Sequence, residues 1–138
     1  SVELVAFCLM PNHFHLLLYS KDDPSQIAKF MQSTCVAYSM YFNRRYKRVG
    51  GLFQSRFKAS RILNDTYLQH ITRYIHLNPA DYKNYRWSSL RYYLREEKVN
   101  WIHPERILDI FGGSYSEFVD EYYDQKMILQ EIKREIND

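Results

Sequence analysis

The segment VELVAFCLMPNHFHLLLYS, residues 2–20, decides the fold of this chain. Its first half is rich in β-branched and aromatic side chains, and a second strand-like run covers residues 13–20. Pro11 and Asn12, between the two runs, are typical turn residues. The segment therefore predicts a β-hairpin, and with it an antiparallel sheet.

Helical and strand-like patterns alternate after the hairpin. Apolar residues recur at helical spacing over residues 24–43, and we expect this helix to pack one face on the sheet. A third strand is predicted over residues 57–63. The next helix should begin at Asn64 or Asp65, which can cap it, and end just before Pro79. This alternation predicts a small α+β fold.

The C-terminal third reads as helical. Three helices are expected there: one from about Ser88, one opened by Pro104 and stopped at Gly112-Gly113, and one that runs from Ser114, with Glu117 in a capping box, to about Ile136. We therefore expect a folded core over residues 1–90 and a helical extension over residues 91–138.

The composition favours a surface of cations and flat rings. The 138 residues carry a formal charge of +3, with thirteen tyrosines, eight phenylalanines and nineteen Lys and Arg residues. Cations and aromatic rings together suit single-stranded nucleic acid, whose phosphates and unpaired bases they contact. A tyrosine-rich core beneath a solvated basic face would give the same composition, so both interpretations stay open at this point.

The cysteines and the apolar runs bear on location. Cys8 and Cys35 each lie among apolar neighbours on separate predicted elements, which indicates buried free thiols and a reducing cytoplasm. The longest apolar run, residues 4–10, is far too short to span a membrane, and no charged-then-apolar leader opens the chain. We expect a cytoplasmic protein with no membrane partner.

His13 and His15 are two residues apart on the second predicted strand, so both imidazoles project from the same face of the sheet. Phe14 between them points the other way, into the core. Two neutral imidazoles on one face can chelate a metal ion. A strand that simply presents two histidines to water has the same pattern, so the pair alone does not decide between these readings.

Four segments together resemble a known family. They are MPNHFHLL at residues 10–17, FQSRF at residues 53–57, YIHLNP at residues 74–79 and YRWSS at residues 85–89. The stretch from Val2 to about Ser89 is similar to the single-tyrosine HUH endonucleases, above all to the transposases associated with repetitive extragenic palindromes (REP) and their insertion-sequence relatives. The resemblance implies a ferredoxin-like (RRM-like) antiparallel sheet with helices on one face. In that family a strand and a helix precede the hairpin, so we expect an N-terminally incomplete core.

The resemblance also implies roles for individual residues. His13 and His15 would hold a divalent metal ion, Mg²⁺ or Mn²⁺, with Asn78 as the third contact. Tyr74 would be the nucleophile that cuts single-stranded DNA and forms a 5′-phosphotyrosine intermediate for strand transfer. The expected DNA is a hairpin or palindromic repeat, and some members of the family act as homodimers. On local evidence alone, Tyr74 reads equally well as a core residue on an apolar helical stripe.

Most of the expected DNA contacts are basic residues near one loop and strand, interleaved with aromatic rings, while Arg73 lies on the helix of Tyr74 and Arg86 in a later loop. The full set is Arg44, Arg45, Lys47, Arg48, Arg56, Lys58, Arg61, Arg73 and Arg86. Arg73 and His70 are also candidates for activating the Tyr74 phenol, whereas His76 lies on another face of the helix and receives no chemical role. Two other functions remain open: a non-catalytic single-stranded nucleic-acid-binding module, and a metallohydrolase that acts on a small phosphoester.

Overall fold

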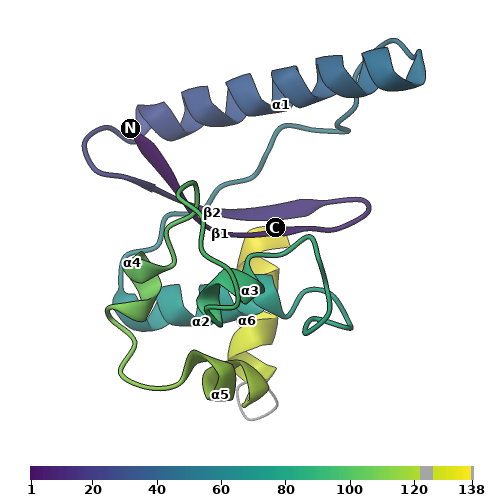
Figure 1. Ribbon diagram of the computed structural model, residues 1–138. Helices are drawn as coiled ribbons and strands as arrows, with labels where there is room; N and C mark the ends of the chain where they lie inside the picture. The colour runs from purple at the N-terminus through teal and green to yellow at the C-terminus, as the bar shows by residue number, and fades with distance from the viewer. Residues whose placement is uncertain (122–125, 138) are drawn as a thin grey trace. The chain divides into compact units, whose positions relative to one another are not determined.

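The computed structural model describes residues 1–121 and 126–137, and it has an α+β arrangement (Figure 1). Strands β1 (Val2–Leu9) and β2 (Phe14–Ser20) form a two-stranded antiparallel sheet, which confirms the predicted hairpin. The helices of the described residues are α1 (Ser25–Tyr46), α2 (Asp65–His76), α3 (Leu90–Tyr93), α4 (Glu105–Leu108), α5 (Tyr115–Asp120) and α6 (Lys126–Asn137).

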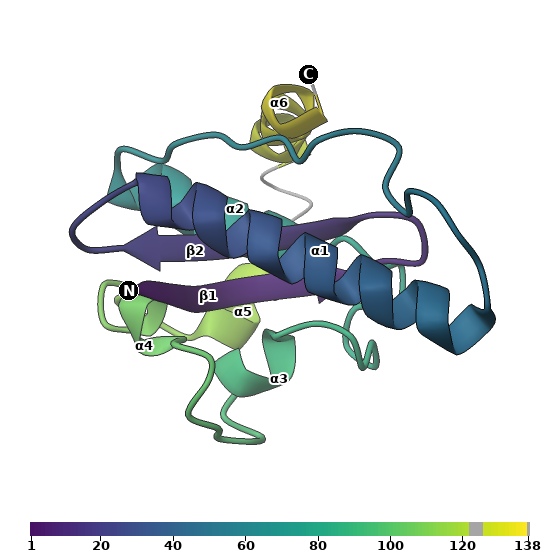
Figure 2. The same cartoon turned by 90° about the horizontal axis from the view of Figure 1, so that it is seen from above.

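The chain divides into two compact units, residues 1–2 with 19–59 and residues 3–18 with 60–138. The first unit is built on α1, the long helix that the view of Figure 2 shows end to end. Helix α1 ends where Lys47 adopts a left-handed conformation, φ 51° and ψ 48°, and donates its N–H to the Asn43 carbonyl. This helix confirms the one predicted from Pro24 and extends one turn further.

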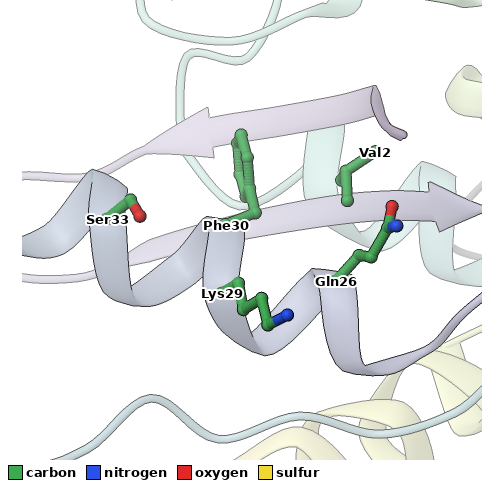
Figure 3. Close-up of a pocket in the computed structure, with 5 residues that line it drawn as sticks. All are labelled: Val2, Gln26, Lys29, Phe30 and Ser33. Atoms are coloured by element: carbon green, nitrogen blue, oxygen red, sulfur yellow. The ribbon is translucent and has the colours of Figure 1, made fainter.

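A hollow of about 440 Å³ lies within the first unit. Its lining comes from four residues of α1, Gln26, Lys29, Phe30 and Ser33, together with Val2 (Figure 3). A second, smaller hollow of about 300 Å³ lies in the second unit, between Glu3 and α4. None of the candidate site residues lines either of them.

The predicted third strand is wrong. Residues 57–63 are irregular, and nearly all their side chains are exposed. Residues 87–89 pair with β1 instead: Leu9 donates its N–H to the Trp87 carbonyl at 2.8 Å, and Ser89 donates its N–H to the Phe7 carbonyl at 2.9 Å. An alternating pattern shows only which side chains could face a sheet, whereas a strand also needs a backbone partner at its edge.

The core of the second unit lies between β1 and the helices. The middle of β1 is buried, and α2 buries Ile71 and Ile75 and contacts α4, α5 and α6. Helix α2 begins as predicted, because the Asn64 side chain accepts a hydrogen bond from the Tyr67 N–H at 2.7 Å. The packing therefore fixes α2 from several sides while its N-terminus is capped locally.

The last predicted helix is divided in two. Ser114 caps α5 as expected, its hydroxyl accepting from the Glu117 N–H at 3.3 Å, but α5 ends at Asp120, and the next described residues form α6 from Lys126. The part of the prediction that covers residues 122–125 lies outside the described residues.

The two cysteines are free thiols, with Cys8 buried and Cys35 partly exposed. Across the described ranges, no helix has the length and apolarity needed to cross a membrane.

Candidate active site

The β-hairpin holds the two histidines at one end of β2. The Met10 N–H donates to the His13 carbonyl at 2.8 Å and closes the turn, so His13 directly precedes β2 and His15 is its second residue. The two rings lie 5.2 Å apart between centroids at an interplanar angle of 77°. His13 is exposed and His15 is half-buried. The imidazoles therefore share one face, with the outer one open to solvent.

Helix α2 brings two further candidate residues to this pair. The Tyr74 ring lies 5.6 Å from the His15 ring at an interplanar angle of 68°. Asn78 lies just beyond the end of α2, and its Oδ1 is 3.1 Å from His13 Nε2. His13, His15, Tyr74 and Asn78 thus meet within the second unit, although some sixty residues separate the hairpin from α2.

The electrostatics of the pair leave His15 neutral. Burial, and secondarily the proximity of His13, lower the pKa of His15 from 6.5 to about 4. A neutral imidazole keeps a lone pair on one ring nitrogen at physiological pH, which is the form that binds metal ions.

His13 contacts an amide oxygen with each of its two ring nitrogens. Its Nδ1 is 2.7 Å from Asn12 Oδ1, and its Nε2 is 3.1 Å from Asn78 Oδ1. A neutral imidazole has a single N–H, so in this orientation of the amides one contact places a lone pair against an oxygen. A positive ion between the two atoms would turn that contact into an attraction.

The donor set fits a divalent metal ion with open coordination positions. Two imidazole nitrogens and an amide oxygen are donors that Mn²⁺ accepts, and Mg²⁺ accepts the oxygen more readily than the nitrogens. Within the described part of the chain, no third His, Cys, Asp or Glu side chain completes a cluster around the pair. The remaining positions would be filled by water or phosphate oxygens.

Arg73 lies on the buried side of α2, which contradicts its predicted place at the DNA surface. Arg73 has no exposed surface: its Nη1 donates to the Phe118 carbonyl at 2.9 Å, its Nη2 lies 3.0 Å from His70 Nδ1, and its guanidinium stacks 4.0 Å from the Phe118 ring. We expected Arg73 at the DNA surface and near the Tyr74 phenol, but the structure turns it into the interior. The Phe118 carbonyl and ring stabilise part of this buried guanidinium, and its Nε is buried without a hydrogen bond among the described residues.

His70 is engaged with the same buried residue. Burial, and then the Arg73 charge, lower the pKa of His70. The His70 ring also lies 5.8 Å from the Phe118 ring, so its contacts belong to the packing of α2 on α5.

The basic residues expected to contact DNA are mostly exposed and fall in both units. In the first unit, Arg45 stacks over Tyr46 at 5.5 Å, and Arg48 is partly buried through hydrogen bonds to Asn43 and Gly51. The other residues of that unit that were expected to contact DNA, Arg44, Lys47, Arg56 and Lys58, are exposed. The second unit holds Arg61 and Arg86, both exposed, with Arg86 stacked 4.8 Å over the Trp87 ring.

Sequence patterns missed Asn12 and Ser89. Asn12 reads as a turn residue, yet its side chain contacts the outer imidazole. Ser89 bonds to both β1 and α2, and its only sequence signal is its place in the YRWSS segment.

Comparison with known proteins shows that these residues lie in the span matched by a family model. The model of the family described as "Transposase IS200 like" matches residues 1–78, more than half of the chain. The matched span contains all four residues of the candidate site. No curated protein and no solved structure matches this sequence.

Proposed function

Because this chain belongs to the IS200-like transposase family, we propose that it cuts single-stranded DNA with Tyr74 as nucleophile and rejoins it through a 5′-phosphotyrosine intermediate. The observation that carries this proposal is the meeting of Tyr74 with His15 and of Asn78 with His13. Two segments distant in sequence bring a phenol, two imidazoles and an amide to one place.

The reaction exchanges one phosphodiester for another. The Tyr74 oxygen gives up its proton and attacks the phosphorus, the bond from phosphorus to the 3′ oxygen breaks, and that oxygen takes up a proton and leaves as a free 3′ hydroxyl. A second 3′ hydroxyl then attacks the phosphotyrosine and releases Tyr74. The bond energy is conserved in the covalent intermediate, so no nucleotide is consumed.

A phosphodiester needs charge neutralisation and in-line positioning more than strong acid or base. A divalent ion, Mn²⁺ or Mg²⁺, held by His13, His15 and Asn78 would supply a Lewis acid beside the scissile phosphate. Helix α2 positions the Tyr74 phenol against the His15 ring, and Arg61 and Arg86, exposed in the same unit, would hold the flanking phosphates.

The expected substrate is a DNA hairpin or palindromic repeat with an unpaired flank, and a homodimer is compatible with this chemistry. The test uses a pool of oligonucleotides, each with a hairpin stem and a randomised single-stranded flank, labelled at the 3′ end. After incubation with Mn²⁺, the label should appear on the protein, because the 3′ fragment stays bonded to the tyrosine.

Tyr74→Phe should abolish the labelled adduct, whereas the matched control Tyr41→Phe, at an exposed tyrosine of α1, should leave it unchanged. Retention of the adduct in Tyr74→Phe would reject this nucleophile. Binding of the pool with no adduct would favour a non-catalytic module, and repeated turnover with free product would favour a hydrolase.

A further inference from the structure

The face of α2 that points away from Tyr74 carries a buried hydrogen-bond network that the proposed chemistry does not use. His76 is two residues beyond Tyr74, so it lies roughly 200° around the helix. It has no exposed surface, its Nδ1 lies 2.6 Å from the Tyr115 hydroxyl, and its Nε2 lies 2.7 Å from the Ser89 hydroxyl. A buried imidazole with both nitrogens engaged fixes its helix in one position.

One arm of this network reaches the strand that leads to the histidine hairpin. The Ser89 hydroxyl accepts from the Phe7 N–H at 2.9 Å and donates to the Phe7 carbonyl at 3.3 Å, while the Ser89 N–H donates to the same carbonyl at 2.9 Å. Phe7 lies in β1, which continues through the turn to His13. The path from α2 to the hairpin therefore runs from His76 through Ser89 to Phe7.

The other arm ends on a different element. Tyr115 opens α5, and its ring packs 5.0 Å from the Tyr93 ring, which itself lies 4.6 Å from the His76 ring. This arm holds α2 against helices, whereas the Ser89 arm holds it directly against the sheet.

Counting hydrogens selects one tautomer. If His76 Nε2 carries the proton, it donates to Ser89, the Tyr115 hydroxyl donates to Nδ1, and the Ser89 hydroxyl donates to the Phe7 carbonyl. All three hydrogens then have partners. With the proton on Nδ1, the Ser89 hydroxyl donates to Nε2 and the Tyr115 hydrogen finds no acceptor among these contacts.

We propose that His76 is a positioning residue, which fixes the Tyr74 ring relative to His15 by tying α2 to β1 through Ser89. That this positioning serves catalysis rests on the proposed function. The position of the Tyr74 ring relative to His15 does not depend on that function. Buried donors left unpaired are costly, so the network favours one register of the helix on the strand. A displacement of about 1 Å at a reacting group can reduce a rate by roughly 100-fold.

The test compares two variants that each delete one hydroxyl bonded to His76. Ser89→Ala breaks the arm to β1, and Tyr115→Phe breaks the arm to α5. Without DNA or metal, proton NMR of the whole chain should show a nuclear Overhauser effect between the His15 and Tyr74 rings. This effect should weaken in Ser89→Ala and persist in Tyr115→Phe. In the unmodified chain, the nitrogen chemical shifts of His76 should report the Nε2–H tautomer.

Adduct formation with the 3′-labelled pool gives the second measurement. At saturating DNA, Ser89→Ala should form the adduct roughly 10-fold or more slowly with unchanged DNA affinity, because only the alignment of the nucleophile changes. Equal losses in the two variants, or an unchanged ring contact and rate in Ser89→Ala, would overturn the proposal.

If Ser89→Ala does not fold, His76→Gln and His76→Asn decide the matter. The Gln amide reaches the place of Nε2 and can still donate to Ser89, while the Asn amide reaches only the place of Nδ1. His76→Gln should keep more of the ring contact than His76→Asn, and the reverse order would reject the Ser89 arm. An unmodified chain that forms no adduct refutes the proposed function, while the ring contact still decides the positioning role.

Discussion

Two tyrosines donate equally short hydrogen bonds to the same strand, and removing their hydroxyls should have unequal consequences. The Tyr93 hydroxyl donates to the Val5 carbonyl at 2.6 Å, and the Tyr85 hydroxyl donates to the Leu9 carbonyl at 2.6 Å. Tyr93 is 2% exposed and Val5 is 3% exposed, whereas Leu9 is 42% exposed. Tyr93→Phe and Tyr85→Phe therefore make one chemical change at two levels of burial.

The burial sets the expected magnitudes. Removing the Tyr93 hydroxyl leaves the buried Val5 carbonyl without that donor, which should lower the free energy of unfolding by about 2 kcal/mol. Water can reach the Leu9 carbonyl and replace the Tyr85 hydroxyl, so we expect a loss of about 0.5 kcal/mol or less there. Phe keeps the ring in both variants, so neither loses much packing.

Urea denaturation of the 138-residue chain, followed by tryptophan fluorescence and circular dichroism, measures both values. The midpoint should fall clearly in Tyr93→Phe and barely in Tyr85→Phe, with the dependence on urea unchanged. Losses of equal size, or a larger loss in Tyr85→Phe, would refute the reasoning that burial makes the difference.

Three further outcomes are expected. Asn64→Ala should cost about 1 kcal/mol of stability in urea denaturation because it removes the side-chain cap of α2, and Asn64→Asp, which keeps the acceptor, should cost much less. Burial lowers the pKa of His76 to about 3, so its contribution to stability is complete above pH 6.5 and falls as the unfolded chain takes up a proton. Between pH 7 and pH 5 His76 should contribute a loss of about 2 kcal/mol, and the lowered pKa of His15 adds a smaller loss in the same direction; a flat response would contradict the burial of His76. Burial raises the pKa of Cys8 to about 11, so a thiol reagent at pH 8 should modify Cys35 in the native chain and Cys8 only after urea is added; rapid native labelling of both would count against the packing of β1.

Local signals predicted the elements that carry the site. The turn at Pro11-Asn12 and the alternating residues on either side define the hairpin, and the Asn64 cap and Pro79 bracket α2. These signals act over a few residues, so they can be read without knowledge of the rest of the fold. The meeting of Tyr74 with the histidines was expected from the family resemblance and not from spacing.

Non-local contacts explain what sequence patterns could not give. The partner of β1 is the segment at residues 87–89 and not the strand-like residues 57–63, because backbone pairing is decided by packing across the chain. The interior position of Arg73 depends on Phe118, forty-five residues away. A histidine on an apolar helix likewise gives no indication that its hydrogen-bond partners, Tyr115 and Ser89, come from two distant segments.

The contact between His13 and Asn78 joins positions 65 residues apart. In an unfolded chain those two side chains are rarely near each other, so an ion or a DNA strand that needs both can bind only the folded state. Such a ligand acts as a reversible cross-link: at 100 times its dissociation constant it would add about 2.7 kcal/mol to stability. The melting temperature of the chain would then serve as a gauge of occupancy, readable before any substrate sequence is known.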